Sequence, residues 1–306
     1  MNFLSSGNSV TSWFVTCRTL LKSQLMRDIK SYLFYGNTLD YEANVIGRQN
    51  HRKSRRQFRG TYVKSFYKKY WQDGYYLAGQ IFDNTLITRI QREYLHALQD
   101  DELSNNGFDD ETIRSNYNYG GYIGSHKGFR RDITDARRAM PSALQLLDQE
   151  QFRELLTNIY GSDFKLDGMV AWRIYHVPKE ISKKFELTTD RLHFDDHYSD
   201  TVKVFICLSD VTDEDGPFQF FPRRFSRDLL WKGFKKELRS TSATGGLASG
   251  FVDVPDLIRH VGRTGEVAFC STPYCLHRAA ETAPGRYRDV LQLVFRPCAD
   301  GEMLTK

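Results

Sequence analysis

The spacing of apolar residues changes near residue 163, from a helical period to the short apolar runs typical of strands. Before that point, segments 84–97 and 152–159 place apolar side chains at helical intervals. Asn84 can cap the first helix, because its short polar side chain can accept a hydrogen bond from the first turn. The two apolar faces consist of Leu86, Ile90, Tyr94 and Ala97 in one segment and Phe152, Leu155, Leu156 and Ile159 in the other.

Four later segments are rich in Val, Ile and Phe and are separated by turn sequences such as DEDGP and APGR. They are 169–177, 201–208, 266–270 and 289–295. Alternate residues of a strand face the same side, and in 201–208 that set is Val202, Val204, Ile206 and Leu208. Helices followed by many strands predict a mainly β fold with flanking helices, as a β-sandwich or a jelly roll.

Positive charge is concentrated in the first 60 residues, which hold ten Lys or Arg and three Asp or Glu, whereas the whole chain has a net charge of +5. We predict a basic N-terminal extension, 1–60, followed by one globular unit, 61–306. The run HRKSRRQFRG has one aromatic residue and no nucleic-acid motif, which favours a solvated linker over nucleic-acid binding. The alternative left open is a non-catalytic barrel that binds an anionic partner or nucleic acid through this run.

The chain has no apolar run near the roughly 20 residues that a membrane span needs, so no membrane partner is expected. Ser, Thr and Asn interrupt the apolar start, which argues against a secretory signal and leaves an organellar transit peptide as the alternative to an ordinary helix. The five cysteines form no CxxC pair, which is typical of reduced thiols. A cytoplasmic location is therefore favoured.

The stretch RLHFDDHYSD, 191–200, contains two histidines and three aspartates. In an extended strand His193 and Asp195 face the same side, with Cα atoms roughly 6.5–7 Å apart, so both side chains can reach one ion. Asp196 faces the other side, and His197 can join only if the chain bends. The spacing favours His193 and Asp195 as two ligands of a metal site.

A facial triad of two histidines and one carboxylate needs a further histidine and leaves positions open for iron(II) chemistry. His277 is the best candidate, because it follows the predicted strand GEVAFC after a short connection. Arg286 and Arg288 lead into the next strand, and arginine binds a carboxylate through two parallel hydrogen bonds. The alternative remains that His193 and Asp195 lie in a surface turn and His277 in the core.

These motifs resemble the phytanoyl-CoA dioxygenase-like family of iron(II)- and 2-oxoglutarate-dependent oxygenases, over about residues 63–298. YWQDGYYLAGQIFDNTLITRIQ resembles the family's entry segment, and PSALQLLDQEQFRELLTNIYGSDFKL its central helix and turn. HFDDHYSDTVKVFICLSDVTDEDGPFQFFP resembles its HxD strand and the following turn. GEVAFCSTPYCLHRAAETAPGRYRDVLQLVF resembles the strand with the distal histidine and the arginine eleven positions later.

The resemblance implies a double-stranded β-helix core, a jelly roll of the cupin type, with His193, Asp195 and His277 as iron ligands. It implies that Arg288 holds the distal carboxylate of 2-oxoglutarate, with Arg286 as the second choice. Gln292 is expected to border this co-substrate from the strand of Arg288. Three residues of the preceding strand are expected to border it as well: Trp172, Arg173 and Tyr175.

The implied reaction is the O₂-dependent hydroxylation of a small molecule, with release of succinate and CO₂; desaturation and ring closure remain open. Asp195 argues against halogenation, because related halogenases have a small residue at this position. The chain departs from the family at PRRF, 222–225, where Arg223 is either a substrate contact or part of a solvated turn. Tyr119 and Tyr122, in the predicted loop 114–132, are candidates for a lid over the substrate.

Overall fold

Two antiparallel sheets face each other in the computed structural model, which describes residues 66, 69–106, 130–160, 163–176, 192–195, 201–226 and 257–298. Within these residues the larger sheet has seven strands, in the spatial order β1 (Tyr75–Gln80), β8 (Glu266–Cys270), β5 (Val202–Cys207), β10 (Tyr287–Pro297), β4 (Phe164–Tyr175), β3 (Arg130–Ile133) and β2 (Ser104–Asn106). The smaller sheet has the order β7 (Ile258–His260), β6 (Phe218–Phe220) and β9 (His277–Ala279). All strand pairs among the described residues are antiparallel.

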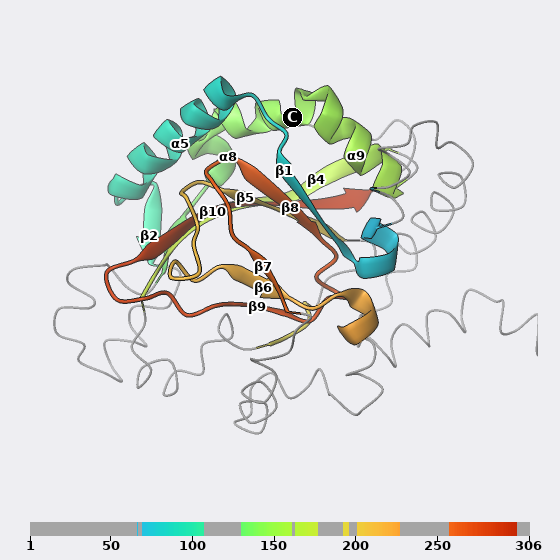
Figure 1. Ribbon diagram of the computed structural model, residues 1–306. Helices are drawn as coiled ribbons and strands as arrows, with labels where there is room; N and C mark the ends of the chain where they lie inside the picture. The colour runs from blue at the N-terminus through green and yellow to red at the C-terminus, as the bar shows by residue number, and fades with distance from the viewer. Residues whose placement is uncertain are drawn as a thin grey trace, which may run out of the picture.

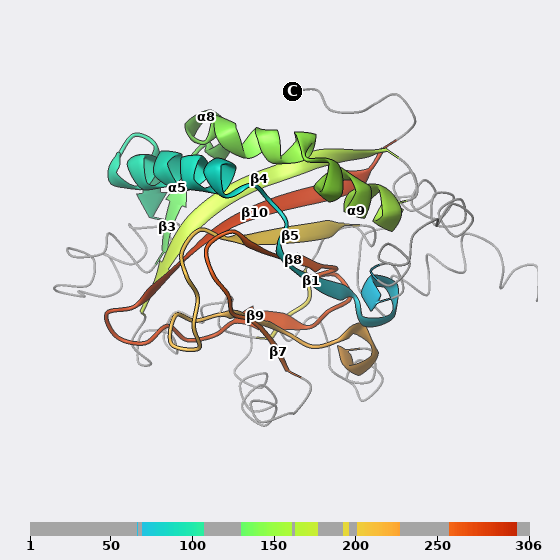
Figure 2. The ribbon, with the colours of Figure 1, turned by 45° about the horizontal axis from the view of Figure 1, so that its top comes forward.

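Helices cover the outer face of the larger sheet, and the smaller sheet lies across its inner face (Figures 1 and 2). The helices are α5 (Asn84–Gln99), α8 (Ala136–Ala139), the 3₁₀ helix η1 (Pro141–Asp148) and α9 (Glu150–Tyr160). The main apolar core lies between the helices and the sheet, where Phe152 of α9 contacts Phe269 of β8 and Phe295 of β10. The predicted mainly β fold with flanking helices is confirmed, as are both predicted helices and the four predicted strands.

Strand β5 shows how the two faces of the larger sheet differ, although all six of its residues are buried. Val202, Val204 and Ile206 belong to the core under the helices. Lys203 and Phe205 point to the opposite face and line a cavity between the sheets. The period of two therefore separates the side chains of the core from those that face the cavity, except at Ile206, which belongs to the core and also borders the cavity.

The structure corrects two local predictions. The N-cap of α5 is Asp83, whose carboxylate accepts hydrogen bonds from the backbone N–H groups of Thr85 and Leu86. Asp83 has an extended backbone and is therefore the residue at the helix boundary, so Asn84 is the first residue inside the helix. The end of the predicted loop 114–132 forms strand β3, which pairs with β4.

Several predictions concern residues outside the described ranges. They are the extension 1–60, the lid candidates Tyr119 and Tyr122, and the pair Asp196 and His197. In the part of the chain that the structure describes, no helix is long and apolar enough to cross a membrane.

Phe152→Ala tests the core between the helices and the sheet. The ring of Phe152 is fully buried and lies 5.1–5.8 Å, between centroids, from Phe82, Phe269 and Phe295. We expect the substitution to lower the free energy of unfolding by about 3–5 kcal/mol, since it leaves a cavity. Urea unfolding followed by circular dichroism measures this. Leu95→Ala, at a 39% exposed position of α5, is the control, and an equal effect of the two changes would contradict the assignment of the core.

Candidate metal centre

His193 and His277 are placed side by side by a backbone bridge between segments 84 residues apart in the chain. The N–H of His193 donates to the carbonyl of His277 at 2.9 Å, and the N–H of His277 donates back at 3.0 Å. Residues paired in this way across an antiparallel bridge project their side chains to the same side. The two imidazole rings accordingly lie 4.3 Å apart, between centroids.

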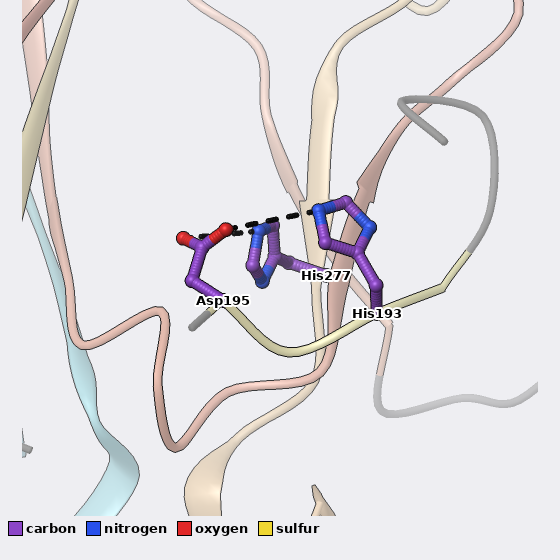
Figure 3. A group of neighbouring side chains, drawn as sticks. All are labelled: His193, Asp195 and His277. Atoms are coloured by element: carbon purple, nitrogen blue, oxygen red, sulfur yellow. Dashed lines mark ion pairs between the residues drawn. The ribbon is translucent and has the colours of Figure 1, made fainter. Parts of the chain in front are cut away.

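Asp195 joins the two histidines because it lies two residues after His193 on the same side of the chain (Figure 3). Its oxygens lie 3.9 Å from Nε2 of His193 and 3.6 Å from Nε2 of His277. One ligand atom from each of the three residues lies within 4.8 Å of the others. Phe194, between them, is buried in a separate apolar cluster with Leu192, Phe221 and Leu276, as the alternation predicts. The structure thus brings the three predicted ligands together.

The protonation of His277 suits a metal ligand. Its Nδ1 lies 2.9 Å from the carbonyl oxygen of Cys275 and donates to it, because a carbonyl can only accept. Burial lowers the pKa of His277 to about 3, against the opposing effect of the Asp195 charge, so the ring is neutral near pH 7. Nε2 then has a lone pair directed toward Asp195. A hydrogen bond from the other ring nitrogen is the usual way in which proteins orient a metal-binding histidine.

Asp195 is ionised, because its pKa lies below the usual value. Burial raises this pKa, but the proximity of His277 and of the Lys203 ammonium outweighs burial. Because His277 is neutral near pH 7, Lys203 is the cation that keeps the pKa of Asp195 low at that pH. The Nζ atom of Lys203 lies 2.8 Å from Oδ2 of Asp195. The backbone N–H of Asp195 also donates to the carbonyl of Thr272, at 3.4 Å, which ties this residue to the loop before His277.

The donor set fits a divalent transition metal. The Nε2 lone pair of His277 faces a carboxylate oxygen at 3.6 Å with no proton between them, an arrangement that a cation at the centre of the three side chains would stabilise. Two imidazoles and one carboxylate are the ligand types of the facial triad that binds non-haem Fe(II). Backbone pairing fixes the two histidines relative to each other, and their ligand atoms already lie close to Asp195, so the three side chains would need little rearrangement to bind an ion.

The three residues open into a cavity of about 280 Å³ between the sheets. Its lining includes all three, together with Arg288 and Gln292 of β10 and His260 of β7. The remaining lining residues are Arg130, Val170, Trp172, Ile174, Lys203, Phe205, Ile206, Cys207, Phe218, Arg278, Ala279 and Val290. A candidate metal centre and a buried arginine therefore line the same cavity.

Arg288, and not Arg286, lines the cavity. Arg288 is buried, and its Nη1 donates to the carbonyl oxygen of Gly216 in the turn DEDGP. Gly216 has φ +70°, and a Cβ there would lie 2.7 Å from the carbonyl oxygen of Ala280, so the turn requires glycine. Arg286 points to the surface side of the same turn, where its Nε lies 2.9 Å from Asp215. Spacing alone left both arginines open, and the start of β10 distinguishes them: Arg288 lies within the strand, whereas Arg286 precedes its first residue and belongs to the turn.

Of the other predicted site residues, some line the cavity and some do not. Gln292 lines the cavity, and Trp172 lines it from β4. Tyr175 does not line it, because it lies three positions from Trp172 and therefore faces the helices, as Arg173 does. Arg223 lies outside the lining, with its guanidinium 4.1 Å above the ring of Tyr274.

Sequence analysis did not place Lys203 or His260 in the cavity lining. Lys203 interrupts the apolar run TVKVFICL at an inward position, and a lone charge in a buried strand was the signal that could have revealed it. His260 belongs to a strand that was not predicted, β7, and no sequence feature marks it. Burial, and then the charge of Arg288, lower the pKa of His260 to about 4.

Comparison with known proteins identifies the fold. No protein-family model matches the chain, and no curated protein matches its sequence. The structure of the epimerase SnoN in complex with Fe3+, alpha ketoglutarate and nogalamycin RO matches with a TM-score of 0.51 and 14% identity, over 80% of this chain and 96% of that one. The non-heme alpha ketoglutarate dependent carbocyclase SnoK matches with a TM-score of 0.50 and 16% identity, over 76% and 83%.

The fold is the double-stranded β-helix. This confirms the predicted core. His277 belongs to β9 of the smaller sheet, and the backbone bridge joins His193 to it from outside the named strands. Membership of the phytanoyl-CoA dioxygenase-like family stays a prediction, since no family model matches.

His260→Gln tests the buried, neutral state of His260. The pKa of His260 is about 4 in the folded protein and near 6.5 in the unfolded chain. Between these two pH values the unfolded state therefore binds more protons than the folded state. Stability should therefore fall as the pH drops from about 6.5 toward 4, and His260 should have little effect above that range. Between pH 7 and pH 5 we expect metal-free wild type to lose about 2 kcal/mol more than the variant, measured by urea unfolding. An equal loss in both proteins would contradict the buried, neutral state.

Proposed function

We propose that the chain is a non-haem Fe(II)- and 2-oxoglutarate-dependent dioxygenase that uses O₂ to hydroxylate a small molecule. The observation that carries this proposal is one cavity lined by His193, Asp195, His277 and Arg288. The first three residues offer the donors of a facial triad. Arg288 offers the fork that pairs with a carboxylate. The phytanoyl-CoA dioxygenase-like family remains the proposed family.

The chain's own residues would hold the two cofactors in a fixed relation. His193, Asp195 and His277 would bind Fe(II), which supplies the activation of O₂ when bound. Arg288 would pair with the far carboxylate of 2-oxoglutarate, and Gln292 would border the same molecule. Because Gly216 accepts a hydrogen bond from Arg288, the guanidinium is oriented before the co-substrate arrives. The backbone bridge between the two histidines fixes the other end of the site.

The walls of the cavity would exclude water from the reacting centre. Phe205 and Phe218 stack at 4.3 Å between centroids, and Val290 packs beside them in the apolar cluster on the inner face. Dry walls suit a reaction in which one oxygen atom of O₂ enters the substrate and the other enters succinate, with loss of CO₂. Hydroxylation is proposed over halogenation because the carboxylate of Asp195 occupies the third ligand position.

The substrate is proposed to be a small molecule, and the structural neighbours are consistent with that class. SnoN is an epimerase and SnoK a carbocyclase, and SnoN is known in complex with nogalamycin RO. Tyr119 and Tyr122 remain proposed lid residues, and Arg223 a proposed contact outside the cavity lining. The catalytic domain is proposed to span 61–306, in the cytoplasm.

An anaerobic titration of metal-free protein with Fe(II) and 2-oxoglutarate tests the proposal. We expect a visible charge-transfer band in the wild type and none in His277→Ala, which lacks one of the three ligands. Arg288→Ala should raise the dissociation constant of 2-oxoglutarate at least about thirtyfold, because a carboxylate in a buried site loses its charged partner. Arg286→Ala is the matched control and should stay close to wild type, since Arg286 lies on the surface side of the turn.

Other outcomes of this titration would favour different functions. If Arg288→Ala bound the co-substrate as wild type does, the site would suit a metalloenzyme that uses no keto acid. If folded wild type bound metal but formed no band, the oxygenase proposal would be wrong. In that case the binding of polyanions by 1–60 should be measured next, in the full chain and in a variant lacking this segment.

A further inference from the structure

Lys203 is a cation buried within the inner face of the larger sheet. In the strand register it lies between Cys270 of β8 and Val294 of β10, both buried. Its side chain is 10% exposed, and burying an ammonium group is costly unless an anion compensates it. Among the described residues the ion-pair partner of Lys203 is Asp195, with Nζ 2.8 Å from Oδ2.

The two oxygens of Asp195 have different surroundings. Oδ2 forms the ion pair with the Lys203 ammonium and also lies 3.6 Å from Nε2 of His277, whereas Oδ1 lies 3.9 Å from Nε2 of His193. A carboxylate can bind a metal through one oxygen or through both. A cation at Oδ2 draws negative charge away from that atom, which favours binding through Oδ1 alone.

We propose that Lys203 is a positioning residue that holds Oδ2 of Asp195, so that the carboxylate binds the metal through Oδ1 and leaves the neighbouring coordination position to the co-substrate. This inference rests on the proposed function. The inference adds Lys203 to the proposed site, which otherwise consists of the three metal ligands and the carboxylate-binding arginine. The side chain acts through Asp195 and does not bind the metal itself.

The charge of Lys203 has a second consequence. A histidine binds a metal as the neutral imidazole, so in the metal-bound centre the charges of Lys203 and Asp195 cancel and the protein contributes no net charge. A bound divalent ion then keeps its full attraction for an anionic co-substrate. Removing the lysine would therefore weaken the binding of 2-oxoglutarate in two ways, through the changed carboxylate and through the lost charge.

Three substitutions separate these effects. Lys203→Met keeps the chain length and removes both the donor and the charge, Lys203→Gln keeps a donor without charge, and Lys203→Arg keeps both. Lys165→Met, on β4 and outside the cavity lining, is the matched control. Circular dichroism first establishes that each variant is folded when loaded with Co(II).

Two measurements then test the inference. Co(II) titration followed by visible absorption reports the coordination of the metal, and anaerobic titration of the Fe(II) protein reports the affinity for 2-oxoglutarate. We expect Lys203→Met to bind Co(II) with an altered absorption spectrum and to bind 2-oxoglutarate at least about tenfold more weakly, as is common when an outer partner of a metal ligand is lost. Lys203→Gln should keep the wild-type spectrum but bind 2-oxoglutarate more weakly, and Lys203→Arg should resemble wild type in both.

The inference is overturned if folded Lys203→Met has the wild-type Co(II) spectrum and the wild-type affinity for 2-oxoglutarate. If Lys203→Met does not fold, Lys203→Gln decides: an altered Co(II) spectrum, or unchanged affinity for 2-oxoglutarate, overturns the inference. A wild-type protein that forms no charge-transfer band refutes the proposed function instead, so the two failures are distinguishable.

Discussion

The candidate site depends on two backbone hydrogen bonds between His193 and His277. Residues far apart in the chain become neighbours because each donates its N–H to the other's carbonyl, at 2.9 and 3.0 Å. β9 in turn pairs with β6, with His277 opposite Phe220, so the bridge is attached to the smaller sheet. Asp195 then needs only the period of an extended chain to reach the same side. The ligand geometry is thus a property of strand pairing, and the side chains have little freedom to depart from it.

The two faces of the larger sheet divide stability from chemistry. The outer face buries Val204 and Leu291 under the helices, and that core provides the apolar burial that fixes the strands. The inner face can therefore place charged residues, Lys203 and Arg288, at positions where a core would need apolar ones. Each charge has a partner in the fold, Asp195 for the lysine and the carbonyl of Gly216 for the arginine. Functional groups are tolerated on this face because the outer face holds the sheet together.

Sequence reasoning could predict what depends on short periods. The alternation in β5 and the pair His193 and Asp195 follow from a period of two, and His277 follows from its place after a strand. The order Arg288 before Arg286 came from the family resemblance, because spacing does not show where β10 begins. Tyr175 lies outside the cavity lining because it is on the opposite face of β4 from Trp172, and the sequence does not show which face turns inward. Lys203 meets Asp195 only through the tertiary fold, since residues 203 and 195 belong to separate segments whose approach no local pattern encodes.

The strand register also orders the charges along the cavity. On β10, Val294 lies opposite Lys203 and Val290 opposite Cys207, and Arg288 lies two residues beyond Val290. The two cations therefore sit at opposite ends of the inner face, with Phe205 and Cys207 between them on β5. Lys203 is paired with Asp195, so the positive charge open to an anion at that end would come from a divalent ion held by the three candidate ligands, and Arg288 supplies the positive charge at the other end. The proposed co-substrate, 2-oxoglutarate, has a carboxylate at each end and matches this order of charges.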